Sequence, residues 1–82
     1  MKVVVKVPKK KRIPVVITTD YIRLDAALKL ANVVSTGGQA KYVIQDELVK
    51  VNGTKCPQRG KKLRDGDNFE FEKVIYEVTK WT

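Results

Sequence analysis

The hydrophobic positions of the chain follow two different periods. Where valine, isoleucine and phenylalanine cluster or alternate with polar residues, the pattern is typical of β-strands. Five segments have this character: residues 1–7, 12–22, 48–56, 68–72 and 73–81. The third is centred on Asn52-Gly53. This dipeptide predicts a hairpin, because both central positions of a type I′ turn require a positive φ.

Between these strands the apolar residues recur three and four positions apart, which predicts two amphipathic helices. The first runs from Leu24 to Asn32, and the second begins at a capping box of Thr36 and Gln39 and ends near Asp46 or Glu47. Two helices joined by about four residues must fold back on each other to bury their apolar stripes. We therefore expect an α+β fold, with a helical hairpin on a small, mostly antiparallel β-sheet and an amino-terminal β extension.

Two of the connecting segments carry turn and charge signals. The run PKKKR at 8–12 lies between two predicted strands and is expected to be an exposed, phosphate-attracting connection. The same run also resembles a nuclear import signal. Residues 57–67 have the composition of a loop, with a turn at Asp65-Gly66.

Length and composition predict a small single-domain protein without disulfides, zinc sites or membrane spans. A chain of 82 residues forms one compact domain, in which we separate a β extension with its basic loop (1–20) from the remainder (21–82). One cysteine and no histidine exclude disulfides within the chain, the usual zinc sites and imidazole chemistry. No apolar run approaches the roughly 20 residues of a membrane span. We expect a cytoplasmic protein that is not an enzyme, with no cofactor, no metal, no membrane partner and no small-molecule substrate.

The charge is large and unevenly distributed. Seventeen Lys and Arg against nine Asp and Glu give a net charge of +8, which favours a polyanionic partner, nucleic acid first. No acidic residue lies between Glu47 and Asp65, where the bases are Lys50, Lys55, Arg59, Lys61, Lys62 and Arg64. A positive face of this kind binds a phosphate backbone by releasing counterions.

The start of the second predicted helix adds geometry to this charge. Unpaired N–H groups at Thr36-Gly37-Gly38, with no Cβ at the glycines and with Lys41 one turn later, would suit a phosphate. The glycines could equally serve only the tight turn between the helices. The sequence leaves both interpretations open.

Three stretches resemble a known family: IRLDAALKLANVV (22–34), STGGQAKYVIQDELVKVNG (35–53) and RGKKLRDGDNFEFE (59–72). Together they resemble the S-four-type RNA-binding domain, or alpha-L motif, and most of all its short stand-alone bacterial members. The resemblance implies a non-catalytic protein that binds structured RNA, ribosomal RNA or a precursor, on ribosomal particles. The positions that the resemblance implies for RNA binding are Arg23, Lys29, Thr36, Gly37, Gly38, Gln39, Lys41, Lys50, Asn52, Arg59, Lys61 and Lys62. We add Arg64, which belongs to the same basic stretch.

The chain departs from the family pattern at two places. Many members carry Ser-Arg where this chain has Thr36-Gly37, so the backbone would have to replace an arginine contact. Cys56-Pro57-Gln58 replaces a stretch that is commonly polar or acidic.

Two other functions are compatible with parts of the sequence. A DNA-binding helix-turn-helix also has two short helices joined at a glycine turn, although most of the positive charge here lies outside the second helix. A β-grasp carrier protein is faintly suggested by VNG and LRDGDNFEF, but such carriers need a Gly-Gly end and this sequence ends in KWT.

Overall fold

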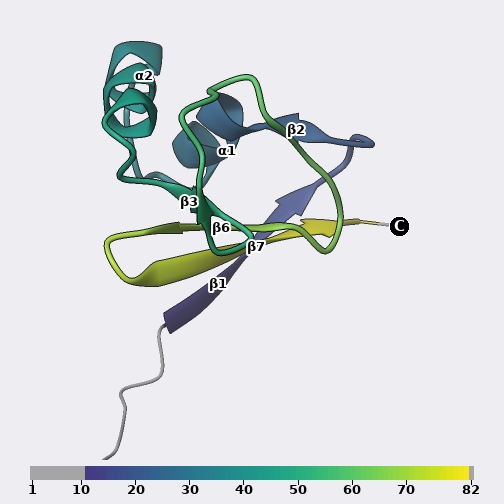
Figure 1. Ribbon diagram of the computed structural model, residues 1–82. Helices are drawn as coiled ribbons and strands as arrows, with labels where there is room; N and C mark the ends of the chain where they lie inside the picture. Colours follow the sequence, from purple (N-terminus) through teal and green to yellow (C-terminus); the bar gives the residue numbers. More distant parts are fainter. Residues whose placement is uncertain (1–10, 82) are drawn as a thin grey trace, which may run out of the picture.

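The computed structural model describes residues 11–81, which form two helices on one face of a twisted sheet (Figure 1). The α+β class and the helical hairpin expected from the sequence are confirmed. In chain order the elements are β1 (Lys11–Ile17), β2 (Ile22–Arg23), α1 (Leu24–Leu30), α2 (Gly37–Gln45), β3 (Lys50–Val51), β4 (Thr54–Lys55), β5 (Lys62–Leu63), β6 (Asn68–Phe71) and β7 (Val74–Lys80).

The main sheet has five strands in the order β1-β7-β6-β3-β4. Its pairings are antiparallel except for β1 and β7, which run parallel from Lys11 opposite Val74 to Ile17 opposite Lys80. Strands β2 and β5 form a separate antiparallel pair beside α1. The first described strand and the last strand of the chain are therefore neighbours, as Figure 1 shows.

Part of the predicted amino-terminal organisation is wrong in detail. The expected strand over 12–22 is broken by a bend after Ile17, and only Ile22 and Arg23 resume strand pairing. Lys11, expected in the connection, belongs to β1 together with Arg12, which the expected strand already included; both side chains are exposed, and Arg12 forms an ion pair with Glu77. The strand predicted over residues 1–7 and the rest of the PKKKR run lie outside the described residues.

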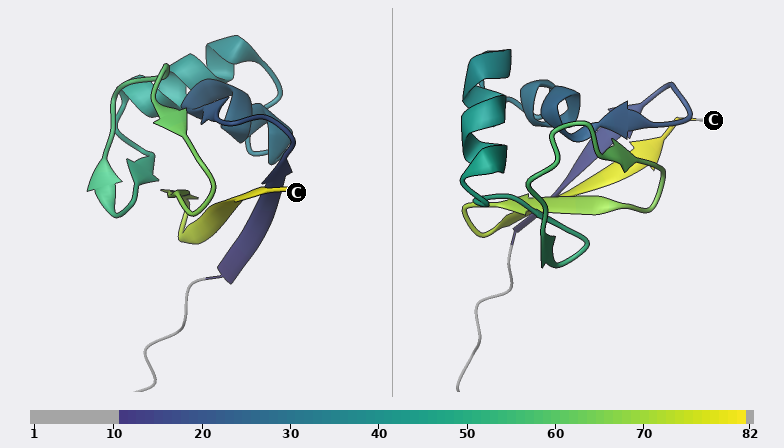
Figure 2. Two further views of the ribbon diagram at one scale, coloured as in Figure 1. Left: turned by 90° about the vertical axis from the view of Figure 1, so that its right-hand side faces the viewer. Right: turned by 45° about the horizontal axis from the view of Figure 1, so that its top comes forward.

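The core lies between the helices and the sheet (Figure 2). Leu24 and Leu28 of α1 and Ile44 of α2 are fully buried, as the spacing of apolar residues predicts. From the sheet, Phe69 is fully buried and stacks on Tyr76 with ring centroids 5.0 Å apart. Each such large side chain contributes about 1.5–3 kcal/mol on burial, so this layer holds both helices against the sheet.

The helix ends are set by local hydrogen bonds. Helix α1 ends at Leu30, two residues before the predicted end, because Asn32 takes a left-handed conformation with φ 59°. At the start of α2, Thr36 Oγ1 accepts a hydrogen bond from the Gln39 N–H at 3.1 Å. The Gln39 side chain does not return to Thr36, because its Oε1 accepts from the Ser35 N–H at 2.7 Å.

Two hairpin turns have left-handed residues at both central positions. Asn52 and Gly53 have φ values of 50° and 85°, which confirms the hairpin predicted from their sequence. Glu72 and Lys73, between β6 and β7, have φ values of 51° and 66°. Glu72 was expected to continue the strand, and the turn is missed because neither residue favours this conformation.

The loop predicted over 57–67 contains one strand. Lys62 and Leu63 form β5, which pairs with Arg23 and Ile22 of β2. Leu63 is fully buried, so a single apolar side chain anchors this otherwise polar segment to the core.

We expect Glu72→Asn combined with Lys73→Gly to raise the free energy of unfolding by about 1 kcal/mol or more. The reason is that left-handed backbone costs ordinary residues roughly 1–2 kcal/mol each, whereas glycine and asparagine adopt it readily. Urea denaturation measures the change. The control is Glu72→Gln with Lys73→Gln, which removes the same charges without relieving the backbone. Equal stability of the two double variants would contradict the prediction.

A second prediction concerns the ion pair of Asp20 and Lys80, which joins the bend after β1 to β7. Lys80 Nζ donates to Asp20 Oδ1 at 2.7 Å, and this hydrogen bond, with the charge of Lys80, lowers the pKa of Asp20 below its ordinary value. Because the pKa is lower in the folded state, the pair stabilises the fold at neutral pH, and this contribution is lost as the pH falls through the lowered pKa.

Lys80→Met should therefore raise the pKa of Asp20 towards its ordinary value in an NMR titration of the carboxyl carbon. Lys73→Met removes a lysine from the β6–β7 turn and serves as the control. An unchanged Asp20 titration in Lys80→Met would show that the pair does not form in solution.

Candidate nucleic-acid interface

The start of α1 is capped by the backbone of a distant loop. The N–H of Leu24 donates to the carbonyl of Lys61 at 2.8 Å, and the N–H of Asp25 donates to the carbonyl of Arg59 at 3.1 Å. Arg23, at the capping position, makes no side-chain cap. Carbonyl oxygens from the loop thus satisfy N–H groups that a helix start otherwise leaves unpaired. The contact fixes the loop against the helix.

This contact brings together five of the predicted site residues, which are far apart in sequence. We call residues 58–64 the basic loop; it carries Arg59, Lys61, Lys62 and Arg64. The guanidinium of Arg23 lies beneath it, since a Cβ at Gly60 would be 3.6 Å from Arg23 Nη2. Arg23 also lies opposite Lys62 in the β2–β5 pair.

Tyr21 organises one end of the basic loop. Lys62 Nζ lies 4.9 Å from the centre of the Tyr21 ring, and the guanidinium carbon of Arg64 lies 5.8 Å from it. Both distances are within the range of cation–π attraction. Sequence reasoning missed this role because Tyr21 is distant from both cations along the chain and only the β2–β5 pairing joins them.

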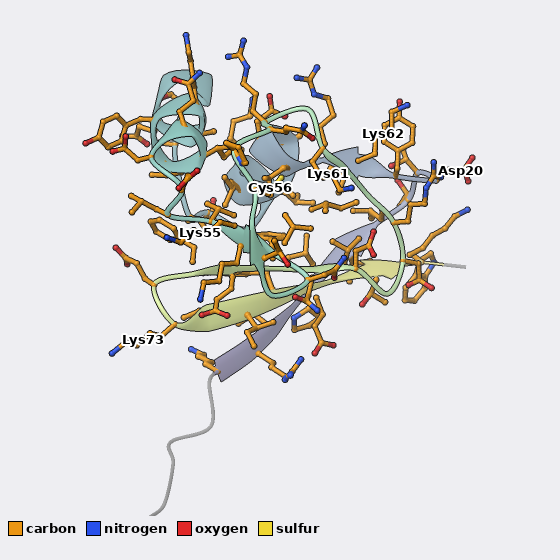
Figure 3. All side chains as sticks on the ribbon, viewed as in Figure 1. Asp20, Lys55, Cys56, Lys61, Lys62 and Lys73 are labelled. Carbon is orange, nitrogen blue, oxygen red and sulfur yellow. The ribbon has the colours of Figure 1, made fainter. Side chains whose placement is uncertain are left out.

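Among residues 11–81, no carboxylate forms an ion pair with a cation of the basic loop. Within residues 11–81, the ion pairs are Arg12 with Glu77, Arg23 with Asp25, and Lys80 with Asp20. No carboxylate of that range therefore pairs with the four basic side chains of the loop. Figure 3 shows Lys61 and Lys62 near α1 and β2, and Lys73 on the opposite side of the molecule. The loop is a positive surface whose cations form no ion pair with the described carboxylates, and such a surface attracts phosphates.

The start of α2 presents a second group of predicted residues. The Thr36 hydroxyl accepts a hydrogen bond from the Gln39 N–H. Within residues 11–81, no group accepts a hydrogen bond from the N–H of Gly37 or of Gly38. Neither glycine has a positive φ, and a Cβ at Gly37 would meet no atom within 4 Å. The turn between the helices therefore does not require these glycines. Lys41, one turn later, is exposed.

Other predicted residues lie elsewhere. Lys50 pairs with Glu70 and Lys55 across the sheet, and because its neighbour Val51 is buried on the helix side, Lys50 points to the opposite face. Lys29 is exposed in the last turn of α1, at the far end of that helix from Arg23.

Asn52 has a structural role in the hairpin. Its Nδ2 donates to Asp67 Oδ1 at 3.3 Å, and its Oδ1 accepts from the Asn68 N–H at 3.0 Å. This side chain holds the turn before β6 in place. One N–H donor and the oxygen of this side chain thus already form hydrogen bonds within the protein.

The described part of the chain offers no metal site or membrane helix. No group of three His, Cys, Asp or Glu side chains in residues 11–81 could hold a metal ion. Over the same range, neither helix has the length and apolar character needed to cross a bilayer. Cys56 is half-buried, and its thiol donates to the Gln58 carbonyl at a sulfur–oxygen distance of 3.8 Å.

Comparison with known proteins agrees with this geometry. A family model described as the S4 domain matches residues 15–79, from within β1 to within β7. The chain is also 42% identical over 59 residues to "Probable ribosome maturation protein RlbA" of Bacillus subtilis (strain 168), covering 72% of this chain and 83% of that protein. Because the family model spans the sheet, both helices and the basic loop together, the chain belongs to the S4 domain family.

Proposed function

We propose that this protein binds structured RNA, without catalysis, through the basic loop and the Arg23 side chain beneath it. The observation that carries the proposal is the cluster of four cations, without an ion pair among residues 11–81, that backbone hydrogen bonds hold against the start of α1. A fixed arrangement of cations can match the spacing of phosphates along a folded RNA. Affinity would then come mainly from counterion release and would fall steeply with salt.

The proposal extends to the start of α2. Gly37 and Gly38 present unbonded N–H groups without side chains, and Lys41 adds charge one turn later. These features suit a phosphate oxygen at the positive end of the helix dipole. Thr36 and Gln39 support this seat by fixing the first turn, since their side chains bond to backbone N–H groups there. Lys29 lies in the last turn of α1, from which the chain leads to the start of α2, and is kept with this second group. Lys50 and Asn52 are left as peripheral candidates, because Lys50 points to the opposite face of the sheet and Asn52 is engaged within the protein.

Ribosomal RNA, or a precursor of it, is the RNA that we favour. The support is the similarity to a protein named for ribosome maturation, together with membership of the S4 domain family. In this role the protein would act in the cytoplasm on ribosomal particles. Recognition by shape and backbone is the usual mode for base-paired RNA, because side chains cannot reach the base edges in its deep, narrow major groove.

The use of the acidic side chains supports a non-enzymatic role. Asp25, Asp65 and Asp67 each accept a hydrogen bond from a backbone N–H, of Ala26, Lys80 and Arg64 respectively. These carboxylates support the local backbone, and within residues 11–81 none of them bonds to a Ser, Thr or Cys side chain. Nothing in the geometry favours the helix-turn-helix alternative, because the main cationic cluster lies outside α2.

The central test is the charge reversal Lys61→Glu with Lys62→Glu. We expect it to weaken binding to hairpin RNA roughly tenfold or more, and to reduce the salt dependence by about one phosphate contact for each lysine. Thermal unfolding should change little, because exposed charges contribute little to stability. Fluorescence anisotropy at two salt concentrations, with hairpin RNA, single-stranded RNA and duplex DNA, gives the affinities.

The control for this test is Lys11→Glu with Lys73→Glu, which changes the net charge equally at the β1 start and the β6–β7 turn. Equal loss of affinity in both double variants would indicate a general charge effect and refute the basic loop as the binding surface. Equal parent affinity for all three nucleic acids would refute the preference for structured RNA.

A second test separates the two roles considered for the glycines. Gly37→Ala with Gly38→Ala should leave stability unchanged or raise it by up to about 1 kcal/mol, because both positions are helical and have room for a methyl group. The same methyl groups should weaken RNA binding by keeping the phosphate from the N–H groups. A folded double variant with parental RNA affinity would eliminate the phosphate seat.

A further inference from the structure

A groove is lined by residues of α2, of β6 and of the β6–β7 turn. Figure 1 shows α2 and this turn on the side of the molecule away from β2. Its volume is about 530 Å³, within the roughly 300–1,000 Å³ typical of small-ligand sites. The lining is mainly apolar: Val33 and Val34 from the connection between the helices, Tyr42 and Val43 from α2, and Phe71 from β6.

Tyr42 is the most accessible ring of this lining. Its side chain is 64% exposed although it borders an apolar surface. The other two tyrosines are engaged, Tyr76 in a stack with Phe69 and Tyr21 with the cations of the basic loop. Within residues 11–81, Tyr42 has no ring or cation contact, so both the ring and the groove beside it are open to a flat partner.

The polar groups around the groove have a definite arrangement. Gly38 and Gln39 line it at the first turn of α2, next to the unbonded N–H groups of Gly37 and Gly38. Glu72 lines it from the β6–β7 turn. The groove therefore offers hydrogen-bond donors at a positive helix end, an apolar and aromatic middle, and a carboxylate acceptor on the other wall.

A nucleotide has the complementary groups in one small unit. Its phosphate accepts hydrogen bonds, its base is flat and largely apolar on both faces, and adenine, guanine and cytosine carry an amino group that can donate to a carboxylate. An apolar peptide side chain would fill the middle of the groove but leave the donors of α2 without an anion. The arrangement of hydrogen-bonding groups, with N–H donors at the start of α2 and the acidic Glu72 opposite them, thus favours a nucleotide as the occupant.

We propose that one unpaired nucleotide of the bound RNA inserts its base into this groove. The base stacks on Tyr42, its amino group donates to Glu72, and its phosphate accepts from the N–H groups of Gly37 and Gly38. This inference rests on the proposed RNA binding and adds a feature to it: the protein would select RNA that has an unstacked base near a base-paired segment. Unpaired bases stacked on aromatic side chains are a common basis of selectivity in RNA recognition.

The test compares two hairpin RNAs that differ only in a single unpaired adenosine in the stem. The parent protein should bind the bulged hairpin about tenfold more tightly, the effect expected for one base stacked on one aromatic ring. Tyr42→Ala should abolish this preference and leave the affinity for the fully paired hairpin unchanged, whereas Tyr42→Phe should retain the preference. Replacing the bulged adenosine by aminopurine, a fluorescent analogue, should give quenching on binding to the parent and not to Tyr42→Ala.

Leu48→Ala is the matched control, since Leu48 is 51% exposed just after α2 but does not line the groove. Circular dichroism verifies that each variant is folded. Equal parent affinity for the two hairpins, or a preference that survives in Tyr42→Ala, would overturn the groove as a base site while leaving the basic loop as the RNA surface. If the parent bound neither hairpin, the proposed RNA binding would fail and this inference with it.

Discussion

The backbone contact between the basic loop and the start of α1 is the interaction on which the candidate interface depends. Two carbonyl groups of the loop serve as the helix cap, so the loop cannot move without leaving N–H groups of α1 unpaired. Buried Leu63 fastens the carboxyl end of the same segment. Cations on a loop of this length would otherwise sample many positions, and the cap converts them into a fixed surface.

The acidic side chains next to the basic loop also form hydrogen bonds that stabilise turns. Asp67 accepts hydrogen bonds from the Arg64 N–H and from the Asn52 side chain, and Asp65 accepts from the Lys80 N–H. These carboxylates lie close to the basic loop in sequence but are committed to turns. The positive surface therefore has two causes: the basic residues are clustered in the loop, and the nearby acidic side chains bond to backbone groups and not to these basic residues.

Local signals in the sequence predicted the helices and the Asn52-Gly53 turn, because apolar spacing, a capping residue and a glycine each act over a few positions. The basic loop was found by its charge. The β1–β7 pairing, β5 and the partners of Tyr21 depend on contacts between distant segments, which no local pattern records. The face on which Lys50 lies depends on the place of β3 in the sheet, and the bonds of Asn52 to Asp67 and Asn68 join residues 15 and 16 positions apart.

The parallel pairing of β1 with β7 has a consequence for how the chain folds. All elements of the helical hairpin and the basic loop lie between these two strands in sequence. The edge of the sheet can close only when residues 74–80 have been synthesised, and pairing across so long a loop is entropically slow. During synthesis β1 therefore has no partner strand until β7 emerges. It contains Pro14, Lys11 and Arg12, and proline and charged residues on an unpaired strand discourage association with other chains.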